Sequence, residues 1–102
     1  MRYEDIRKMN ILKETMLYKF YSGYSASIRN GKDFKTALSM ACFMDGKQVF
    51  DLKLDVAWFV MNEVTAYNTL SSYDGFKRLI DKGYIEVRPH SKKAEDENIV
   101  GL

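Results

Sequence analysis

The stretch from Gly75 to Arg88 changes its hydrophobic period within a few residues, and it constrains the fold more than any other part of the chain. Its first half places three apolar side chains on one face of a helix, at Phe76, Leu79 and Ile80. Gly83 is positioned to end that helix, because glycine readily adopts the left-handed conformation that follows a last helical turn. Tyr84 to Arg88 then alternates with the period of a strand. The sequence therefore predicts a helix, a glycine stop and a strand.

A charged segment follows the predicted strand. His90 to Asp96 contains no apolar side chain larger than Ala94, which is typical of a hairpin tip. Ile99 to Leu102 is a short apolar run, and we expect Asn98 to Val100 to pair back as a second strand. The C-terminal part of the chain is thus predicted to be a small β-hairpin.

The N-terminal part is predicted to be one long helix, from residue 3 to about residue 29. Its apolar side chains recur every three or four residues, at Ile6, Met9, Leu12, Met16, Phe20, Tyr24 and Ile28. This stripe is able to pack inside its own chain or against a second copy. On a chain this small we favour the second copy, and we expect a homodimer interface at Ile6, Met9, Leu12, Met16 and Phe20.

Shorter elements are expected between these two parts. In chain order they are a helix capped by Asp33, a turn at Asp45-Gly46, a strand at Lys47–Phe50, a helix capped by Asp51, a connection at Thr65–Leu70, and a helix whose capping box runs from Ser71 to Asp74. The helix after Asp51 is apolar on most of its sides around Trp58, which predicts a central core helix.

Composition excludes several classes of function. A chain of 102 residues with 46% hydrophobic residues is expected to form a single folded domain, 1–102. Cys42 is the only cysteine and lies in an apolar run, so we expect a buried thiol and no disulfide. One histidine, no Gly-rich phosphate loop and no cysteine pair give no basis for an enzyme, a metal site or a cofactor. With no signal peptide and no long apolar span, we expect a cytoplasmic protein without membrane contact.

A family resemblance arises from the predicted order after residue 33, which is helix, strand, helix, helix, strand, charged hairpin, strand. The chain with this order resembles the winged helix-turn-helix family. Two segments carry the resemblance: Phe76-Lys77-Arg78-Leu79-Ile80-Asp81-Lys82-Gly83-Tyr84-Ile85, and the segment from Arg88 to Leu102. The wing is most similar to those of MarR-like prokaryotic and phage regulators. The resemblance implies an α+β fold, mainly α with a small C-terminal β-hairpin, in which the long helix at 1–30 precedes a winged-helix core at 33–102. The long apolar segment from Asp51 to Tyr67 departs from the compact second helix of that family.

The resemblance also implies a transcriptional regulator that binds duplex DNA through its third helix and its basic wing. The DNA contacts that it implies are Ser71, Ser72, Tyr73, Lys77 and Arg78 in the helix, and Arg88, His90, Lys92 and Lys93 in the wing. The net charge of +2 does not itself indicate a nucleic-acid binder. Asp74 and Asp81 alternate with the bases of the helix, as they would on an ordinary solvated surface. The alternative is a non-catalytic protein-interaction module, for example a small phage accessory protein that binds a host factor.

Overall fold

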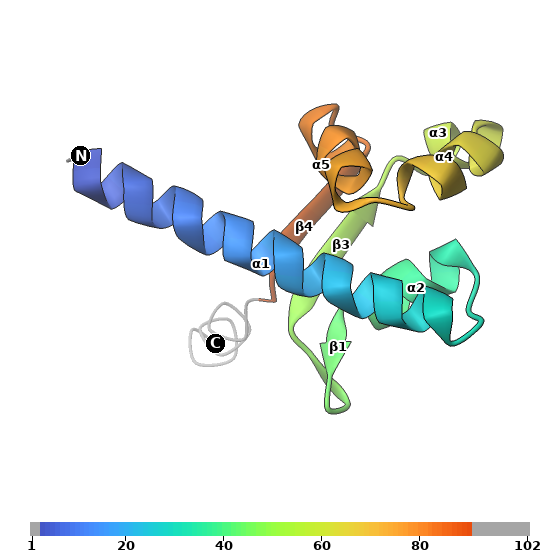
Figure 1. The fold of residues 1–102 in the computed structure, drawn as a ribbon, viewed down its shortest axis with the longest axis horizontal. Coiled ribbons are helices and arrows are strands. Elements are labelled where there is room, and N and C mark those ends of the chain that lie inside the picture. The colour runs from blue at the N-terminus through green and yellow to red at the C-terminus, as the bar shows by residue number, and fades with distance from the viewer. Residues whose placement is uncertain (1–2, 91–102) are drawn as a thin grey trace, which may run out of the picture.

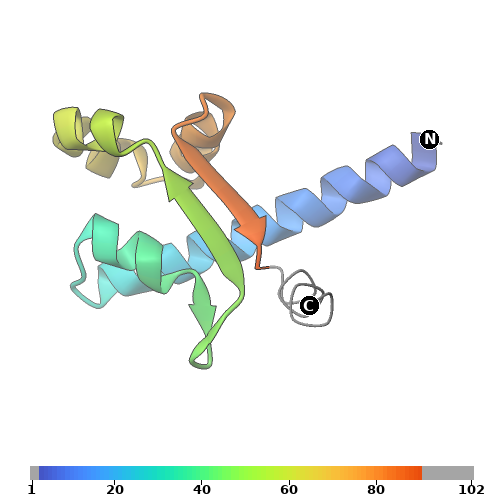
Figure 2. The ribbon, with the colours of Figure 1, turned by 180° about the vertical axis from the view of Figure 1, so that it is seen from behind.

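One long helix runs across the whole molecule in the computed structural model, which describes residues 3–90 and the side chains of residues 10–90. This helix, α1 (Tyr3–Arg29), has 27 residues and is therefore about 40 Å long. Figures 1 and 2 show that the other described elements gather along its C-terminal half, while its N-terminal half projects beyond them. The described fold is a small α+β domain that is mostly helical.

The remaining elements are short. They are α2 (Phe34–Met40), β1 (Phe43–Met44), β2 (Lys47–Gln48), β3 (Phe50–Leu54), α3 (Val56–Met61), α4 (Glu63–Thr69), α5 (Tyr73–Asp81) and β4 (Ile85–Pro89). The described strands form two antiparallel pairs, β1 with β2 and β3 with β4. In the second pair Leu52 lies opposite Val87. The pairing of β3 with β4 holds the two ends of the α3–α5 segment together.

Several predicted elements are confirmed. The long helix has the predicted range, and Asp33 caps α2 by accepting a hydrogen bond from the Thr36 amide at 2.8 Å. Asp45-Gly46 forms the turn between β1 and β2. Gly83 follows α5 with a φ of 81°, the left-handed conformation expected after a helix, and β4 begins two residues later.

Other boundaries were predicted wrongly. Asp51 does not cap a helix, because Phe50 to Leu54 pairs with β4 as a strand. The cap is Asp55, whose carboxylate accepts a hydrogen bond from the Trp58 amide at 3.1 Å. The predicted connection at 65–70 is largely α4. The cap of α5 is Ser72 rather than Ser71, and its hydroxyl accepts from the Gly75 amide at 3.0 Å.

The core lies where α1 crosses α5 and β3. Phe20 is fully buried there, with its ring stacked on Phe76 at 5.7 Å between centroids and edge-on to Phe50 at 5.8 Å. Phe20 therefore has no surface left for a partner, and its place in the expected homodimer interface is corrected. Cys42 is buried as expected, and burial raises the pKa of its thiol.

The expected C-terminal hairpin and the expected core helix around Trp58 have different outcomes. The hairpin tip and the returning strand, with Lys92 and Lys93, lie outside the described residues. The expected central core helix is wrong, because Phe59 is the buried residue of α3 while Val56, Val60 and Met61 are exposed. Within residues 3–90, no helix is long and apolar enough to cross a membrane.

Candidate functional site

The helices α3 and α4 carry apolar residues on two sides. The inner side packs into the core through Phe59, Ala66 and Leu70. The outer side exposes five large apolar residues to solvent, with exposed fractions of 67% for Val56, 61% for Val60, 83% for Met61, 74% for Val64 and 49% for Tyr67. We call these five residues the outer face of α3–α4. Asn62, whose backbone is not helical, separates the two helices. Val56 and Val60 lie one turn apart on α3, and Val64 and Tyr67 lie one turn apart on α4.

The apolar character of the outer face is unusual for a surface. Single exposed apolar residues are normal in soluble proteins, whereas a cluster of them marks an interaction surface. A helix that is apolar on all sides is one that is buried on all sides. Removing the exposed part of a valine or methionine side chain from water is favourable by on the order of 1 kcal/mol. The outer face therefore has the composition of a surface that another molecule covers.

The chain segment that carries the outer face has charges of one sign. The segment from Leu54 to Phe76 contains no lysine and no arginine. Its three acids, Asp55, Glu63 and Asp74, are all exposed. A partner with basic side chains beside an apolar strip would match this surface, whereas a phosphate backbone would be repelled by it.

The predicted DNA contacts in α5 are largely engaged within the chain. The Lys77 ammonium lies 2.8 Å from the Glu14 carboxylate of α1, and the Tyr73 hydroxyl donates a hydrogen bond to the same oxygen at 3.1 Å. The bond from Lys77 lowers the pKa of Glu14 and raises the pKa of Lys77. Burial, followed by the contact with Glu14, raises the pKa of the Tyr73 phenol. These side chains hold α1 against α5.

The serines and Arg78 are placed differently. The Ser72 hydroxyl caps α5, and the Ser71 hydroxyl donates to the carbonyl oxygen of Asn68 at 2.6 Å. Arg78 is exposed on α5. Among the bases predicted for the third helix, Arg78 is thus the one on the open surface, and Asp74 one turn before it carries the opposite charge.

The described bases of the expected wing also have partners. Arg88 forms an ion pair with Glu86 at 3.2 Å on the exposed side of β4. Nδ1 of His90 lies 2.8 Å from the carboxylate of Asp51, which ties the end of β4 to β3. The described residues therefore do not bring the predicted DNA contacts together on one basic surface.

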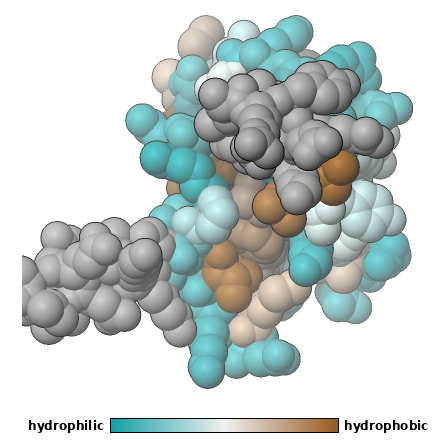
Figure 3. Space-filling view, turned by 90° about the vertical axis from the view of Figure 1, so that its left-hand side faces the viewer, coloured by the Kyte–Doolittle hydropathy of each residue, from teal (hydrophilic) through white to brown (hydrophobic). Residues whose placement is uncertain are grey.

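The expected homodimer residues fall along α1 in three environments. Leu12 is exposed, Met16 is half-buried and Phe20 is buried, while the side chains of Ile6 and Met9 lie outside the described residues. Leu12 and Met16 form one wall of an apolar groove whose other wall is Val87 to Pro89 of β4. Figure 3 views the molecule from the side on which α1 projects, and apolar surface gathers at its centre.

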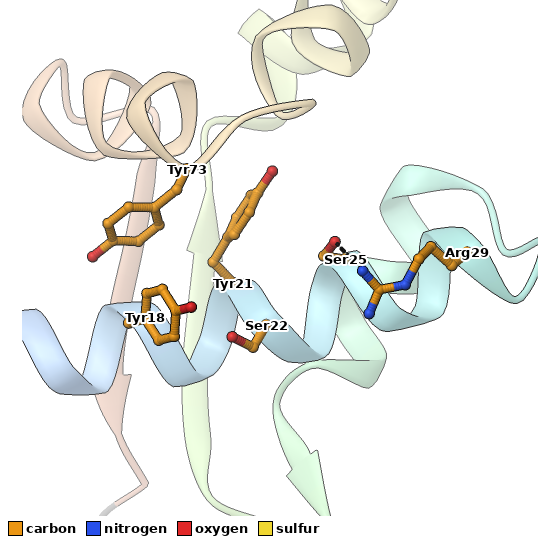
Figure 4. A pocket seen from close by; sticks show the side chains of 6 residues that line it. All are labelled: Tyr18, Tyr21, Ser22, Ser25, Arg29 and Tyr73. Carbon is orange, nitrogen blue, oxygen red and sulfur yellow. Dashed lines mark hydrogen bonds between the residues drawn. The ribbon is translucent and has the colours of Figure 1, made fainter.

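A second hollow lies on the other side of α1 and is lined by hydroxyls. Its lining residues are Tyr18, Tyr21, Ser22, Ser25, Arg29 and Tyr73 (Figure 4). The Tyr21 hydroxyl is directed out of the hollow, where it donates to the carbonyl oxygen of Leu70 at 2.8 Å. The Arg29 guanidinium turns back towards the Ser25 hydroxyl at 3.5 Å. The Tyr21 hydroxyl and the Arg29 guanidinium thus serve contacts within the chain.

Chemistry at a metal or at an isolated buried polar group has no support in the described part of the chain. Within it, no three histidine, cysteine or acidic side chains are placed to hold a metal ion. No buried side-chain nitrogen or oxygen there lacks a hydrogen-bond partner.

The outer face of α3–α4 was not predicted as a site. Two signals for it were present in the sequence: the run from Val56 to Met61 is apolar at every position, and the surrounding segment from Leu54 to Phe76 has no base. The first signal was interpreted as a core helix. No protein-family model, no curated protein and no solved structure matches this chain.

Proposed function

We propose that the protein is a non-catalytic interaction module that binds another protein through the outer face of α3–α4. The observation that carries this proposal is the cluster of five exposed apolar side chains within twelve residues, on helices whose other side is already in the core. Such a surface is stabilised when a partner removes it from water.

The partner that fits this surface is an amphipathic helix with basic residues beside its apolar stripe. Each of the two short helices contributes one pair of exposed apolar residues a turn apart, Val56 with Val60 and Val64 with Tyr67, against which the side chains of another helix can pack. Asp55 and Glu63 are exposed beside these residues, so lysine or arginine on the partner would gain favourable contacts with them.

Duplex DNA binding is the second candidate, and the arrangement of the elements favours it. The helix α4, the three residues Leu70 to Ser72 and the helix α5 follow the order of a helix-turn-helix, and β4 pairs antiparallel with β3 behind them. This order supports a winged helix in which α5 is the third helix and the segment after β4 is the wing. A fold alone does not specify a function, however, and the absence of bases from Leu54 to Phe76 opposes phosphate contacts by the turn.

The two candidates are distinguished by titrations followed by fluorescence anisotropy. The protein probe is a synthetic helical peptide with leucines at positions i, i+4 and i+7 and lysines beside them. We expect saturable binding to the wild type, and binding weaker by about tenfold for a matched peptide with glutamates in place of the lysines. The double substitution Val60→Ser with Val64→Ser should abolish binding.

The control variant for these titrations is Phe43→Ser with Met44→Ser, which removes two exposed apolar residues of β1 and should leave binding unchanged. Equal binding of the peptide to the wild type and to the Val60/Val64 variant would contradict the proposal. Random duplex DNA is titrated in parallel over a range of salt. Salt-dependent DNA binding that persists in the Val60/Val64 variant would favour the second candidate.

A further inference from the structure

The apolar groove between α1 and β4 lies open in the described part of the chain. Leu12 and Met16 form one wall, and Val87 and Pro89 are in the other. Its volume is about 320 Å³, at the lower end of the range for ligand pockets in proteins. Leu12 is 69% exposed, whereas Leu17 is buried in the core. The groove is therefore at the edge of the body, and its size suits a short segment rather than a whole helix.

The chain leaves β4 directly at this groove. Pro89 is one of its lining residues, and His90 is the last described residue. In the sequence, Ile99 follows nine positions after His90 and begins an apolar run that includes Val100 and Leu102. A chain of nine residues without regular structure spans about 17 Å on average and about 30 Å at full extension. The apolar run is therefore within reach of the groove.

The groove is also better placed for this run than the outer face of α3–α4. In the β3–β4 pair, Phe50 lies opposite Pro89 at one end, and Leu54 lies opposite Ile85 at the other. The helix α3 follows Leu54, so the outer face begins at one end of the strand pair while His90 follows its other end (Figure 1). Of these two apolar surfaces, the groove is the one beside the point where the described chain ends.

A segment of the same chain has an advantage over any partner in solution. A short linker gives a tethered segment an effective concentration on the order of millimolar. A second copy, or another protein, competes only at its own concentration. Ile99, Val100 and Leu102 have the apolar side chains that are stabilised when a groove of this kind removes them from water.

We propose that residues 99–102 dock in the groove between α1 and β4 of their own chain. The segment is then an intramolecular ligand, which covers Leu12 and Met16 and excludes other apolar peptides from the groove. The inference does not involve the outer face of α3–α4, so it stands or fails independently of the proposed function.

Disulfide exchange tests this contact in the full chain. Cys42→Ala removes the native thiol, Val100→Cys places one thiol in the segment, and Leu12→Cys places the other at the groove. The control carries Asn10→Cys in place of Leu12→Cys. Asn10 is exposed on the same helix but lines a different hollow, on the side of α5. Equilibration in a glutathione redox buffer measures the effective concentration of each thiol pair. We expect it to be at least about tenfold higher for the Leu12 pair than for the Asn10 pair.

A further variant separates docking from mere proximity. In the Leu12 pair, Ile99→Ser with Leu102→Ser removes two apolar side chains and keeps the linker. The effective concentration should then fall to that of the Asn10 control. Circular dichroism checks that every variant folds.

Three results would overturn the inference. The first is an equal effective concentration for the Leu12 and Asn10 pairs. The second is an unchanged value for the Leu12 pair after Ile99 and Leu102 are replaced. The third is a disulfide that joins two chains at micromolar protein in place of the internal one, which would mean that a second copy occupies the groove.

Discussion

The ammonium of Lys77 lies 2.8 Å from the carboxylate of Glu14, and this contact joins α5 to α1 across 63 positions of the sequence. The Tyr73 ring lies beside it, 5.5 Å from the ring of Tyr18 and 5.7 Å from the Lys77 ammonium. Two residues that a DNA-binding helix would present to phosphates thus contact α1 instead, beside the buried residues of α1 that pack in the core.

The contact with Glu14 should make stability depend on pH. The pKa of Glu14 is lowered from 4.5 in the folded chain, chiefly by the bond from Lys77. A lowered carboxyl pKa contributes stability above the unfolded pKa, and this stability is lost as the pH falls through the folded pKa. Replacing Glu14 with Gln should therefore lower the urea midpoint at pH 7 and have no effect at a pH well below 4. An equal effect at both pH values would show that the contact does not depend on charge.

The core around Phe20 should dominate stability. Replacing Phe20 with Ala leaves a cavity between the rings of Phe50 and Phe76, and it should lower the free energy of unfolding by about 3–5 kcal/mol. Urea denaturation followed by circular dichroism measures this loss. Lys19→Ala, at the exposed neighbouring position, is the control and should change stability little. A small effect of Phe20→Ala would mean that α1 does not pack in the core as described.

Gly75 should tolerate no side chain. A Cβ atom at this position would overlap the carbonyl oxygen of Thr69, which belongs to the backbone and cannot move aside without opening the turn between α4 and α5. Gly83 has a positive φ but open space around it, so alanine there should cost about 1 kcal/mol. We expect Gly75→Ala to lower the thermal midpoint far more than Gly83→Ala. The reverse order would contradict the close approach of α5 to Thr69.

The thiol of Cys42 should react slowly in the native chain. Its side chain is buried and its sulfur is 3.7 Å from the carbonyl oxygen of Leu38, and burial raises its pKa. Reaction with a disulfide reagent such as dithionitrobenzoate should be at least about tenfold slower than in urea, because the thiolate is the reactive form and the sulfur is covered. Equal rates in buffer and in urea would place Cys42 on the surface.

Local sequence signals were sufficient for α1, α2 and the helix–glycine–strand stretch, because a stripe, a cap or a glycine specifies each of them. They were insufficient at Asp51. Asp51 and Asp55 both precede apolar residues and both suit a helix cap, and the choice depends on pairing with β4. The residues that pair with Phe50 to Leu54 lie more than thirty positions further along the chain, from Ile85 to Pro89. The hydrophobic period of a short segment does not show whether the segment pairs with a strand so far away in the sequence.

The outer face could not be recognised from the sequence for a related reason. Phe59 and Val60 are adjacent and equally apolar, yet the first is buried and the second is exposed. Where both sides of a helix are apolar, the period does not distinguish the side that its own core covers from the side that a partner covers. Only the position of α5 and α2 around α3–α4 separates the two.

The measurement that tests the account most directly is photocrosslinking from the outer face. A benzophenone amino acid replaces Met61, which is 83% exposed, and the chain is irradiated in the presence of the lysine-flanked helical peptide. The account predicts a crosslinked product with this peptide in clear excess over a control with the same group at Phe43. A crosslinked product no more frequent than in that control would contradict it.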